Sequence, residues 1–172
     1  MRACAPITVA AGVLVAVLLS PSPAVAATCW TPPVSGVVTD PFREPPCPYC
    51  AGNRGIEYAV GTRTPVRAVA AGVVDWSGTV AGTRYVVVRH TNGWRATYGQ
   101  LDSSTLSTGD RVLARTVVGR ASGTAYFGLR RGDDYIDPAP FLGHLVGRPR
   151  LVPIDGTRAR AAPAPRLRCA AS

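Results

Sequence analysis

The stretch YVVVRHTNGWRATY, residues 85–98, decides the fold, because it contains two strand-like segments joined by a turn. Its first half is dense in valine, and β-branched residues in such a run favour a buried strand. Asn92-Gly93 is the dipeptide preferred in type I′ hairpin turns. Residues 94–98 supply the second strand. The stretch therefore predicts an antiparallel β-hairpin.

Further short strand-like segments lie on both sides of this hairpin. They occur at residues 35–40, 66–70, 73–76, 125–129 and 135–138, with Gly109-Asp110 as another turn. The 18 glycines and 16 prolines suit a turn-rich β fold, and no stretch holds helical periodicity for long. The 172 residues are enough for one ordinary domain. We therefore predict an all-β fold, a small antiparallel β sandwich or barrel-sandwich.

Composition changes at both ends of the chain. Arg2, an apolar run at 7–19 and the small residues Ala24-Val25-Ala26 have the order of a secretory signal peptide. The tail from Arg148 carries six arginines against one acid and repeated Ala-Pro steps, which is typical of disorder. The predicted organisation is a signal peptide at 1–26, a proline-rich lead-in at 27–51, a β domain at 52–147 with its first strand from about 34, and a basic tail at 148–172.

The cysteine count predicts two disulfides. Of five cysteines, Cys4 leaves with the signal peptide, and an even number in an exported chain indicates disulfides. Four cysteines allow three connectivities. We favour Cys47–Cys50 as a local staple and Cys29–Cys169 as a link between the two tails.

Two other uses of these cysteines remain open. Cys29 follows the signal peptide and could carry a lipid, although prolines separate it from the apolar run. Cys47 and Cys50 have zinc-like spacing and could act with His90 and His144, but an oxidising compartment favours a disulfide.

Every basic side chain is arginine, and the formal net charge is +9. Such a charge attracts the chain to anionic surfaces, which outside a cell include wall polymers. The pattern of short strands around Ala71-Gly72 and Gly109-Asp110 also resembles that of lipoyl and biotinyl carrier domains. Those carriers attach their cofactor through a lysine, and this chain has none.

Four stretches in order along the chain resemble the lysostaphin-like (LytM-type) zinc peptidases of cell walls. They are residues 33–43, GTRTPVRAVAAGVV at 61–74, VVVRHTNGWRATYGQL at 86–101 and GLRRGDDYIDPAPFL at 128–142. The resemblance covers most of the predicted mature chain. It implies a small antiparallel β sandwich of the duplicated hybrid kind, with a shallow groove.

The resemblance also implies that the metal site has been lost. The zinc ligands in the family's His-x-Gly-x-Asp and His-x-His motifs correspond to Asn53, Glu57 and Tyr126. Its remaining catalytic histidines correspond to Gln100 and Thr124, which cannot act as general bases near neutral pH. An amide binds zinc poorly, and a phenol must lose a proton with a pKa of about 10. We therefore expect neither zinc nor another cofactor, and no catalytic residues.

The same polar residues are expected to line a peptide-binding groove, since they offer donors and acceptors suited to amides. The expected groove residues are Asn53, Glu57, Tyr98, Gln100, Thr124 and Tyr126. The sequence thus predicts a secreted, wall-associated, catalytically inactive domain that binds peptidoglycan or anionic wall polymers, or regulates a cell-wall amidase or peptidase. The alternative is a zinc metallo-endopeptidase that hydrolyses peptidoglycan cross-links. Neither hypothesis involves nucleic acid or a transmembrane segment.

Overall fold

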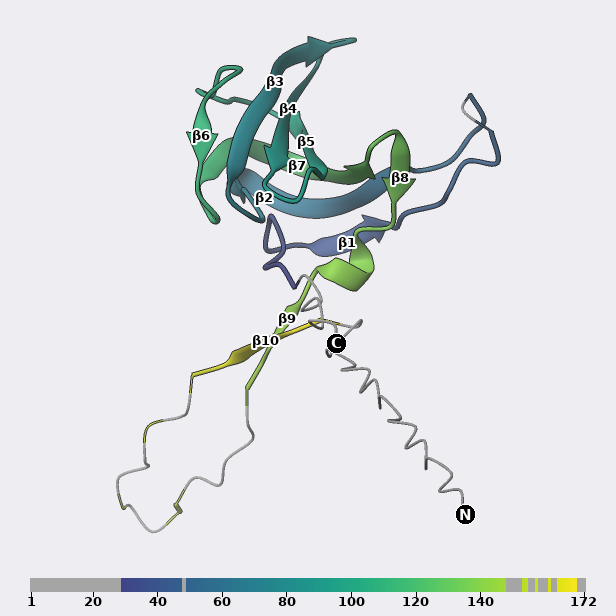
Figure 1. The fold of residues 1–172 in the computed structure, drawn as a ribbon. Coiled ribbons are helices and arrows are strands. Elements are labelled where there is room, and N and C mark those ends of the chain that lie inside the picture. Colours follow the sequence, from purple (N-terminus) through teal and green to yellow (C-terminus); the bar gives the residue numbers. More distant parts are fainter. Residues whose placement is uncertain are drawn as a thin grey trace, which may run out of the picture.

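The computed structural model describes residues 29–47, 49–147, 153–154, 157, 161 and 164–169. Almost all of the regular secondary structure in these residues is β-strand (Figure 1), with one short 3-10 helix within the described ranges. In chain order the elements are β1 (Val37–Asp40), β2 (Gly55–Arg67), β3 (Gly72–Val80), β4 (Thr83–His90), β5 (Arg95–Leu101), β6 (Arg111–Val112), β7 (Val117–Arg131), β8 (Asp134–Ile136), η1 (Ala139–Phe141), β9 (His144–Val146) and β10 (Arg166–Arg168). The predicted all-β fold is confirmed.

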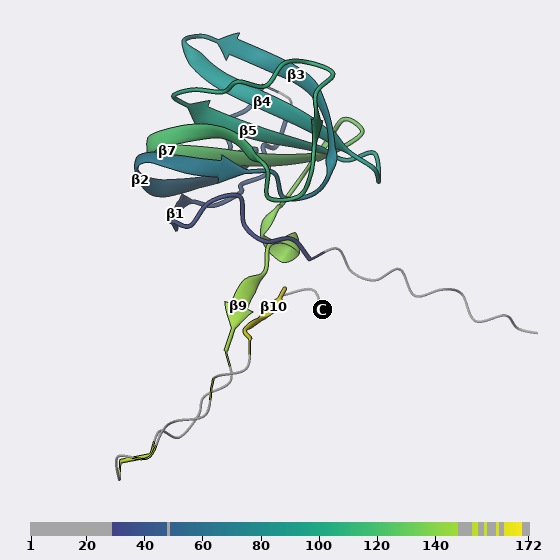
Figure 2. The same ribbon diagram turned by 90° about the vertical axis from the view of Figure 1, so that its left-hand side faces the viewer.

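Eight strands form one antiparallel sheet. Seven of them follow the order β1-β2-β7-β5-β4-β3-β6, and β8 pairs with the C-terminal end of β7. Figure 2 shows most of this order directly, from β3 through β4, β5, β7 and β2 to β1. The long strands β2 and β7 pair from Gly55 opposite Gly128 to Arg67 opposite Val117. Their register shifts twice along this length, and such irregularities bend a sheet. The result is a strongly curved sheet around one core.

Alternate residues of the central strands build this core, because successive side chains in a strand point to opposite faces. Tyr98 of β5 and Phe127 of β7 lie opposite each other, both with 0% exposure, and their ring centroids are 5.4 Å apart. Val86 and Val88 of β4 are also fully buried. The valine run in the central stretch therefore becomes a buried strand, as predicted.

The central hairpin forms, but its turn is not type I′. A type I′ turn needs positive φ at both central residues. Of Asn92 and Gly93, only Gly93 has positive φ, at 81°. The Gly93 amide donates to the His90 carbonyl at 3.0 Å, and the His90 amide donates to the Trp94 carbonyl at 2.8 Å. The loop thus has three residues, 91–93, and ends on a left-handed glycine, which is the next most common hairpin geometry.

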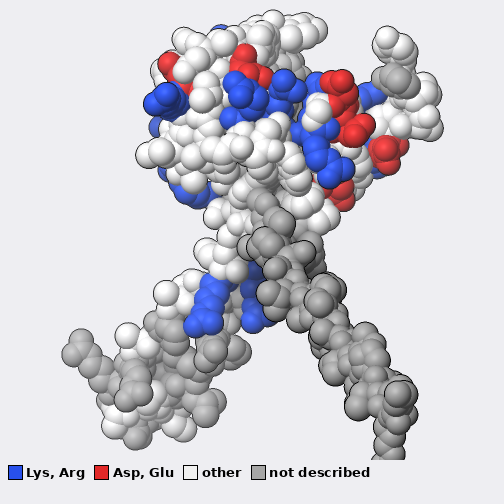
Figure 3. Space-filling model, viewed as in Figure 1, with Lys and Arg blue, Asp and Glu red and all other residues white. Residues whose placement is uncertain are grey.

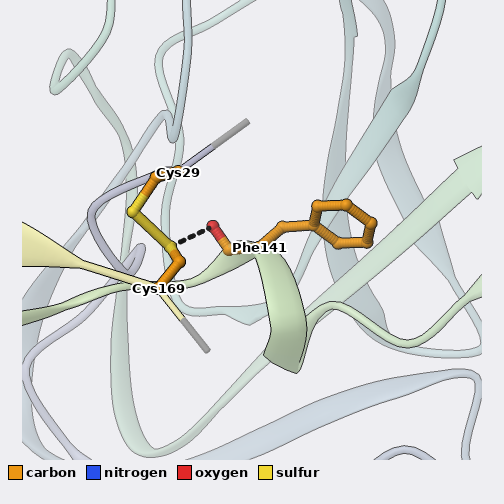
Figure 4. Close-up of a disulfide and its surroundings, with 3 residues drawn as sticks. All are labelled: Cys29, Phe141 and Cys169. Carbon is orange, nitrogen blue, oxygen red and sulfur yellow. Dashed lines mark hydrogen bonds between the residues drawn. A yellow bond between two sulfur atoms is a disulfide. The ribbon is translucent and has the colours of Figure 1, made fainter. Parts of the chain in front are cut away.

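The lead-in is fastened to the domain at Trp30. The Trp30 amide donates to the Phe141 carbonyl at 2.8 Å, and the Gly143 amide donates to the Trp30 carbonyl at 2.8 Å. The Trp30 ring packs against Trp94 and Phe141 and belongs to the core. Cys29, just before it, is bonded to Cys169. Figure 4 shows this disulfide beside Phe141, with the Cys169 sulfur 3.3 Å from the Phe141 carbonyl oxygen.

A two-stranded ribbon, β9–β10, projects from this junction (Figure 1). The sequence predicted a disordered tail linked through Cys169 to Cys29, so the strand at Arg166–Arg168 was not foreseen. In the view of Figure 3, basic and acidic groups are mixed over the domain. In the described part of the ribbon, the charged groups that can be seen are all basic. The predicted signal peptide and most of the tail lie outside the described residues.

Both favoured disulfides are present, Cys29–Cys169 and Cys47–Cys50. The described residues contain no helix that is long and apolar enough to cross a membrane.

The two disulfides are expected to contribute unequally to stability. Replacement of Cys29 and Cys169 by serine should lower the free energy of unfolding by up to about 5 kcal/mol, because that bond closes a long loop in the unfolded chain. The matched change at Cys47 and Cys50 should cost at most about 2 kcal/mol, because its loop is very short. Urea unfolding of the two double variants measures both values, and equal losses would contradict this assignment.

Candidate functional site

A shallow cavity of about 350 Å³ lies on the face of the sheet opposite the core. Its lining residues are Arg54, Glu57, Tyr85, Thr97, Gln100, Tyr126, Arg130 and Tyr135. They come from β2, β4, β5, β7, β8 and the residue before β2. Three of the expected site residues, Glu57, Gln100 and Tyr126, are thus brought together.

Tyr126 lies over a floor of three glycines on three neighbouring strands. A Cβ added to Gly55 of β2 would lie 2.6 Å from the Tyr126 ring, and one added to Gly99 of β5 would lie 3.1 Å from it. A Cβ on Gly128, two residues further along β7, would lie 2.7 Å from the Tyr126 hydroxyl oxygen. Side chains at these positions would displace the ring. The glycines therefore create the space that the tyrosine fills.

The Tyr126 phenol is neutral in this setting. Burial raises its pKa above the ordinary value, and the nearby phenols of Tyr135 and Tyr85 raise it further. The Tyr85 ring meets the Tyr126 ring edge-on, with centroids 6.4 Å apart. A phenol of this kind can donate a hydrogen bond, but it does not supply the phenolate that would bind a metal at neutral pH.

Glu57 and Gln100 face each other across the cavity. The Gln100 Nε2 donates to Glu57 Oε1 at 3.3 Å, and Glu57 lies opposite Tyr126 in the pairing of β2 with β7. Gln100 has a left-handed backbone, with φ of 56°, beside a register shift between β4 and β5. Irregularities of this kind redirect a side chain. As a result Gln100 lines the same cavity as Thr97, although the two residues are an odd number of positions apart on β5.

Asn53 does not line the cavity. It is 7% exposed, and its Nδ2 donates to the carbonyls of Asp40 and Pro41, each at 3.2 Å. Its Oδ1 accepts a hydrogen bond from the Gly55 amide at 3.3 Å. The side-chain amide thus holds the end of β1 against the start of β2. Its hydrogen-bonding groups are engaged in the fold, so the expectation that Asn53 binds a ligand in the groove is not supported.

Tyr98 and Thr124 also lie outside the cavity lining. Tyr98 points to the core face of β5, where its hydroxyl accepts a hydrogen bond from the Val69 amide at 2.9 Å. Its assignment to the groove was wrong because Tyr98 lies on the opposite face of the strand from Thr97 and Gly99. Thr124 is half-buried on β7, opposite Ala59.

Five lining residues were not predicted as site residues: Arg54, Tyr85, Thr97, Arg130 and Tyr135. The Tyr135 ring carries two guanidinium groups, Arg54 at 5.5 Å and Arg130 at 5.1 Å from its centroid. Arg130 also pairs with Asp133 at 3.0 Å. The alternation of side chains along a strand could have identified Arg130, because it lies four residues after Tyr126 and therefore on the same face of β7.

The two histidines lie apart from the cavity. His90, 4% exposed, packs against Trp30, and its Nδ1–H donates to the Ala71 carbonyl at 2.9 Å. His144 is exposed on β9. Cys47 and Cys50 are bonded to each other. The alternative of a zinc site built from these four residues is therefore not supported by their positions.

A family model for Peptidase family M23 matches residues 51–138, slightly more than half of the chain. The chain belongs to peptidase family M23. The matched region begins in the loop before β2 and ends after β8, so it contains the cavity. The resemblance seen in the sequence is confirmed. Comparison with curated proteins finds no significant match.

Solved structures with this fold include three that differ in context. Csd3 from Helicobacter pylori is 22% identical, with a TM-score of 0.59, over 68% of this chain and 35% of its own. A point mutant of the catalytic domain of the prophage-encoded M23 protein EnpA from Enterococcus faecalis is 27% identical, with a TM-score of 0.54, over 63% of this chain and 95% of its own. A chain of the SpoIIQ–SpoIIIAH pore-forming complex is 19% identical, with a TM-score of 0.60, over 68% of this chain and 92% of its own. The chain spans about a third of the length of the Csd3 chains.

The residues present do not fit the zinc ion that the family implies. A catalytic zinc site needs about three His, Cys or carboxylate ligands and one open position. The described residues contain no group of three such side chains close enough to hold a metal. Asn53 is engaged with backbone groups, Tyr126 is a neutral phenol, and only Glu57 offers a carboxylate. We therefore derive no hydrolytic step for this cavity.

His90 gives the domain a pH-dependent stability. Burial lowers its pKa, with an opposing contribution from its hydrogen bond to Ala71, so the folded state binds fewer protons than the unfolded state. The contribution of His90 to the free energy of unfolding is fully present above the pKa of a histidine in the unfolded chain, about 6.5. It is lost as the pH falls below that value. The free energy of unfolding should therefore decrease from pH 7.5 to pH 5. This decrease should be smaller in His90→Gln, and in the control His144→Gln it should equal that of wild type. A decrease as large as that of wild type in His90→Gln would contradict the role assigned to His90.

Proposed function

We propose that this chain is an exported, catalytically inactive member of family M23 whose cavity binds a peptide portion of peptidoglycan. One observation carries the proposal: Tyr126 fills the space over the three-glycine floor, beside a Glu57–Gln100 hydrogen bond. The polar cavity remains open to solvent, although the residues for zinc chemistry are absent from it. Such a cavity can bind without reacting.

The lining of the cavity suits a peptide rather than an apolar ligand. Gln100 and Thr97 offer donors and acceptors to amide groups, and tyrosine rings supply flat contact area. Glu57 and Arg130 place opposite charges in the same cavity, which favours a ligand with both an ammonium and a carboxylate. Stem peptides of cell walls carry groups of these kinds.

Export and wall association complete the proposal. Two disulfides are expected in an oxidising compartment, and the predicted signal peptide agrees with export. A chain with this fold occurs in the SpoIIQ–SpoIIIAH complex, so the fold also takes part in protein assemblies. A cell-wall hydrolase is accordingly the second candidate partner for this chain.

Zinc content tests the inactivity directly. Protein purified without chelator should contain no stoichiometric zinc by elemental analysis, because its cavity lacks a ligand set. The triple variant Asn53→His, Glu57→Asp, Tyr126→His is the positive comparison and should take up zinc if its fold is retained. About one zinc per wild-type chain, held against mild chelation, would favour the metallo-endopeptidase instead.

Peptidoglycan binding can be separated from simple charge attraction by salt. Exposed charges are screened over about 10 Å at 0.1 M salt and about 3 Å at 1 M, whereas partly buried hydrogen bonds are screened far less. Binding to purified peptidoglycan, stripped of anionic polymers, should therefore persist at 1 M salt. Gln100→Ala combined with Tyr135→Ala should weaken it about tenfold or more, since each lost hydrogen bond contributes about 0.5–1.5 kcal/mol.

Two further variants complete that experiment. Tyr49→Ala removes a fully exposed tyrosine outside the cavity and should bind like wild type. Substitution of Arg148, Arg150, Arg158 and Arg160 by glutamine removes tail charge without breaking the Cys29–Cys169 bond, and should weaken binding at low salt alone. If the cavity variant binds as well as wild type at every salt concentration, the cavity is not a peptidoglycan site, and a protein partner becomes the favoured ligand.

A further inference from the structure

The two disulfides of this chain differ in their surroundings. Cys29–Cys169 spans 140 residues, and Cys169 is 7% exposed at the junction of the two tails. Cys47–Cys50 spans three residues in the loop between β1 and β2, which projects away from the sheet (Figure 1). Cys47 is exposed, Cys50 is half-buried, and Tyr49 between them is fully exposed. The second bond is therefore accessible to another molecule.

The loop that carries Cys47 and Cys50 is closed at its base without help from that bond. The Arg43 amide donates to the Asn53 carbonyl, and the Asn53 amide donates to the Arg43 carbonyl, both at 2.9 Å. The Asn53 side chain adds hydrogen bonds to Asp40 and Pro41, and Arg43 forms an ion pair with Asp40. Opening the disulfide therefore leaves the ends of β1 and β2 in place. A bond that can open and close without unfolding the domain is suited to reversible chemistry.

We propose that the Cys47–Cys50 disulfide is a thiol–disulfide exchange site for an exported dithiol oxidoreductase. Exposed disulfides exchange readily because an attacking thiolate must reach a sulfur atom. A disulfide that closes a very short loop also restrains the unfolded chain little, so the folded protein gains little from keeping it. Both features distinguish it from Cys29–Cys169.

The exchange proceeds in two balanced steps. A thiolate of the reduced partner attacks the exposed Sγ of Cys47, and a mixed disulfide forms while the bond to Cys50 breaks. The bonding electron pair leaves on the Cys50 sulfur, which takes a proton from water. The partner's second thiolate then attacks the partner's first sulfur, which is bonded to Cys47 in the mixed disulfide. The partner's disulfide forms, and Cys47 leaves as a thiolate. The partner loses two electrons and the Cys47–Cys50 pair gains two.

The exchange site adjoins the candidate site. Cys47 lines a second cavity, of about 320 Å³, together with Arg54 and Tyr135. Arg54 and Tyr135 also line the Tyr126 cavity, so the two cavities share a wall. The redox state of the loop can therefore alter that wall. The exchange itself is independent of what the Tyr126 cavity binds, so its test stands apart from the proposed function.

A redox titration of the full chain tests the proposal. Oxidised protein is equilibrated with graded ratios of reduced to oxidised glutathione, quenched by alkylation, and mapped peptide by peptide with mass spectrometry. Cys47 and Cys50 should become alkylated at a ratio at least tenfold less reducing than Cys29 and Cys169 require. The domain's far-ultraviolet circular dichroism should be unchanged at that ratio, because the backbone bridge between Arg43 and Asn53 holds the loop. Joint reduction of both bonds, or earlier reduction of Cys29–Cys169, would overturn the proposal.

Two single variants test which sulfur is attacked. In Cys50→Ser the free thiol is Cys47, and in Cys47→Ser it is Cys50. With oxidised glutathione, Cys50→Ser should form its mixed disulfide at least severalfold faster, because Cys47 is the more exposed of the two. Equal rates, or a faster Cys47→Ser variant, would overturn the assignment of Cys47. The double variant Cys29→Ser, Cys169→Ser is the matched control, and its Cys47–Cys50 titration should follow that of wild type.

Discussion

The pairing of β2 with β7 is the constraint on which the rest of the structure depends. These two strands run side by side for most of the domain, and each face of the pair has its own role. The inner face carries Ile56, Tyr58, Ala125 and Phe127 into the core. The outer face places Glu57 opposite Tyr126 at the cavity. Because side chains alternate along a strand, one register sets both the packing and the site.

Much of the fold could be predicted because its signals are local. The valine-rich stretch at 85–89 and the turn at 92–93 together predict a hairpin, and the hairpin is present. The turn type could not be predicted, since it depends on how many residues the flanking strands leave unpaired. The strand at Arg166–Arg168 was missed for a related reason. Its partner β9 lies at the other end of the proline-rich tail, and the composition of the tail gives no sign of that pairing, although the neighbouring Cys29–Cys169 bond was predicted.

The candidate site was less predictable because a motif position does not fix the direction of a side chain. Asn53 stands at the start of the motif, yet its amide is engaged with the carbonyls of Asp40 and Pro41. Tyr98 is polar at one end, but it faces the core, where Val69 satisfies its hydroxyl. Thr97, its neighbour, lines the cavity instead. Strand alternation would have separated these two residues, had the face of β5 been known.

The motif residues Asn53 and Tyr126 are both integrated into the fold. The Asn53 side-chain amide satisfies three backbone groups. Its loss would leave the buried Gly55 amide unpaired, at a cost of about 1–3 kcal/mol. The Tyr126 ring covers Gly55, Gly99 and Gly128, so a smaller side chain there would leave a void above bare backbone. Asn53 and Tyr126 therefore each contribute to the stability of the fold at these motif positions. Replacement of either residue to build a metal site would therefore disturb contacts that the fold already uses, which agrees with the binding role proposed above.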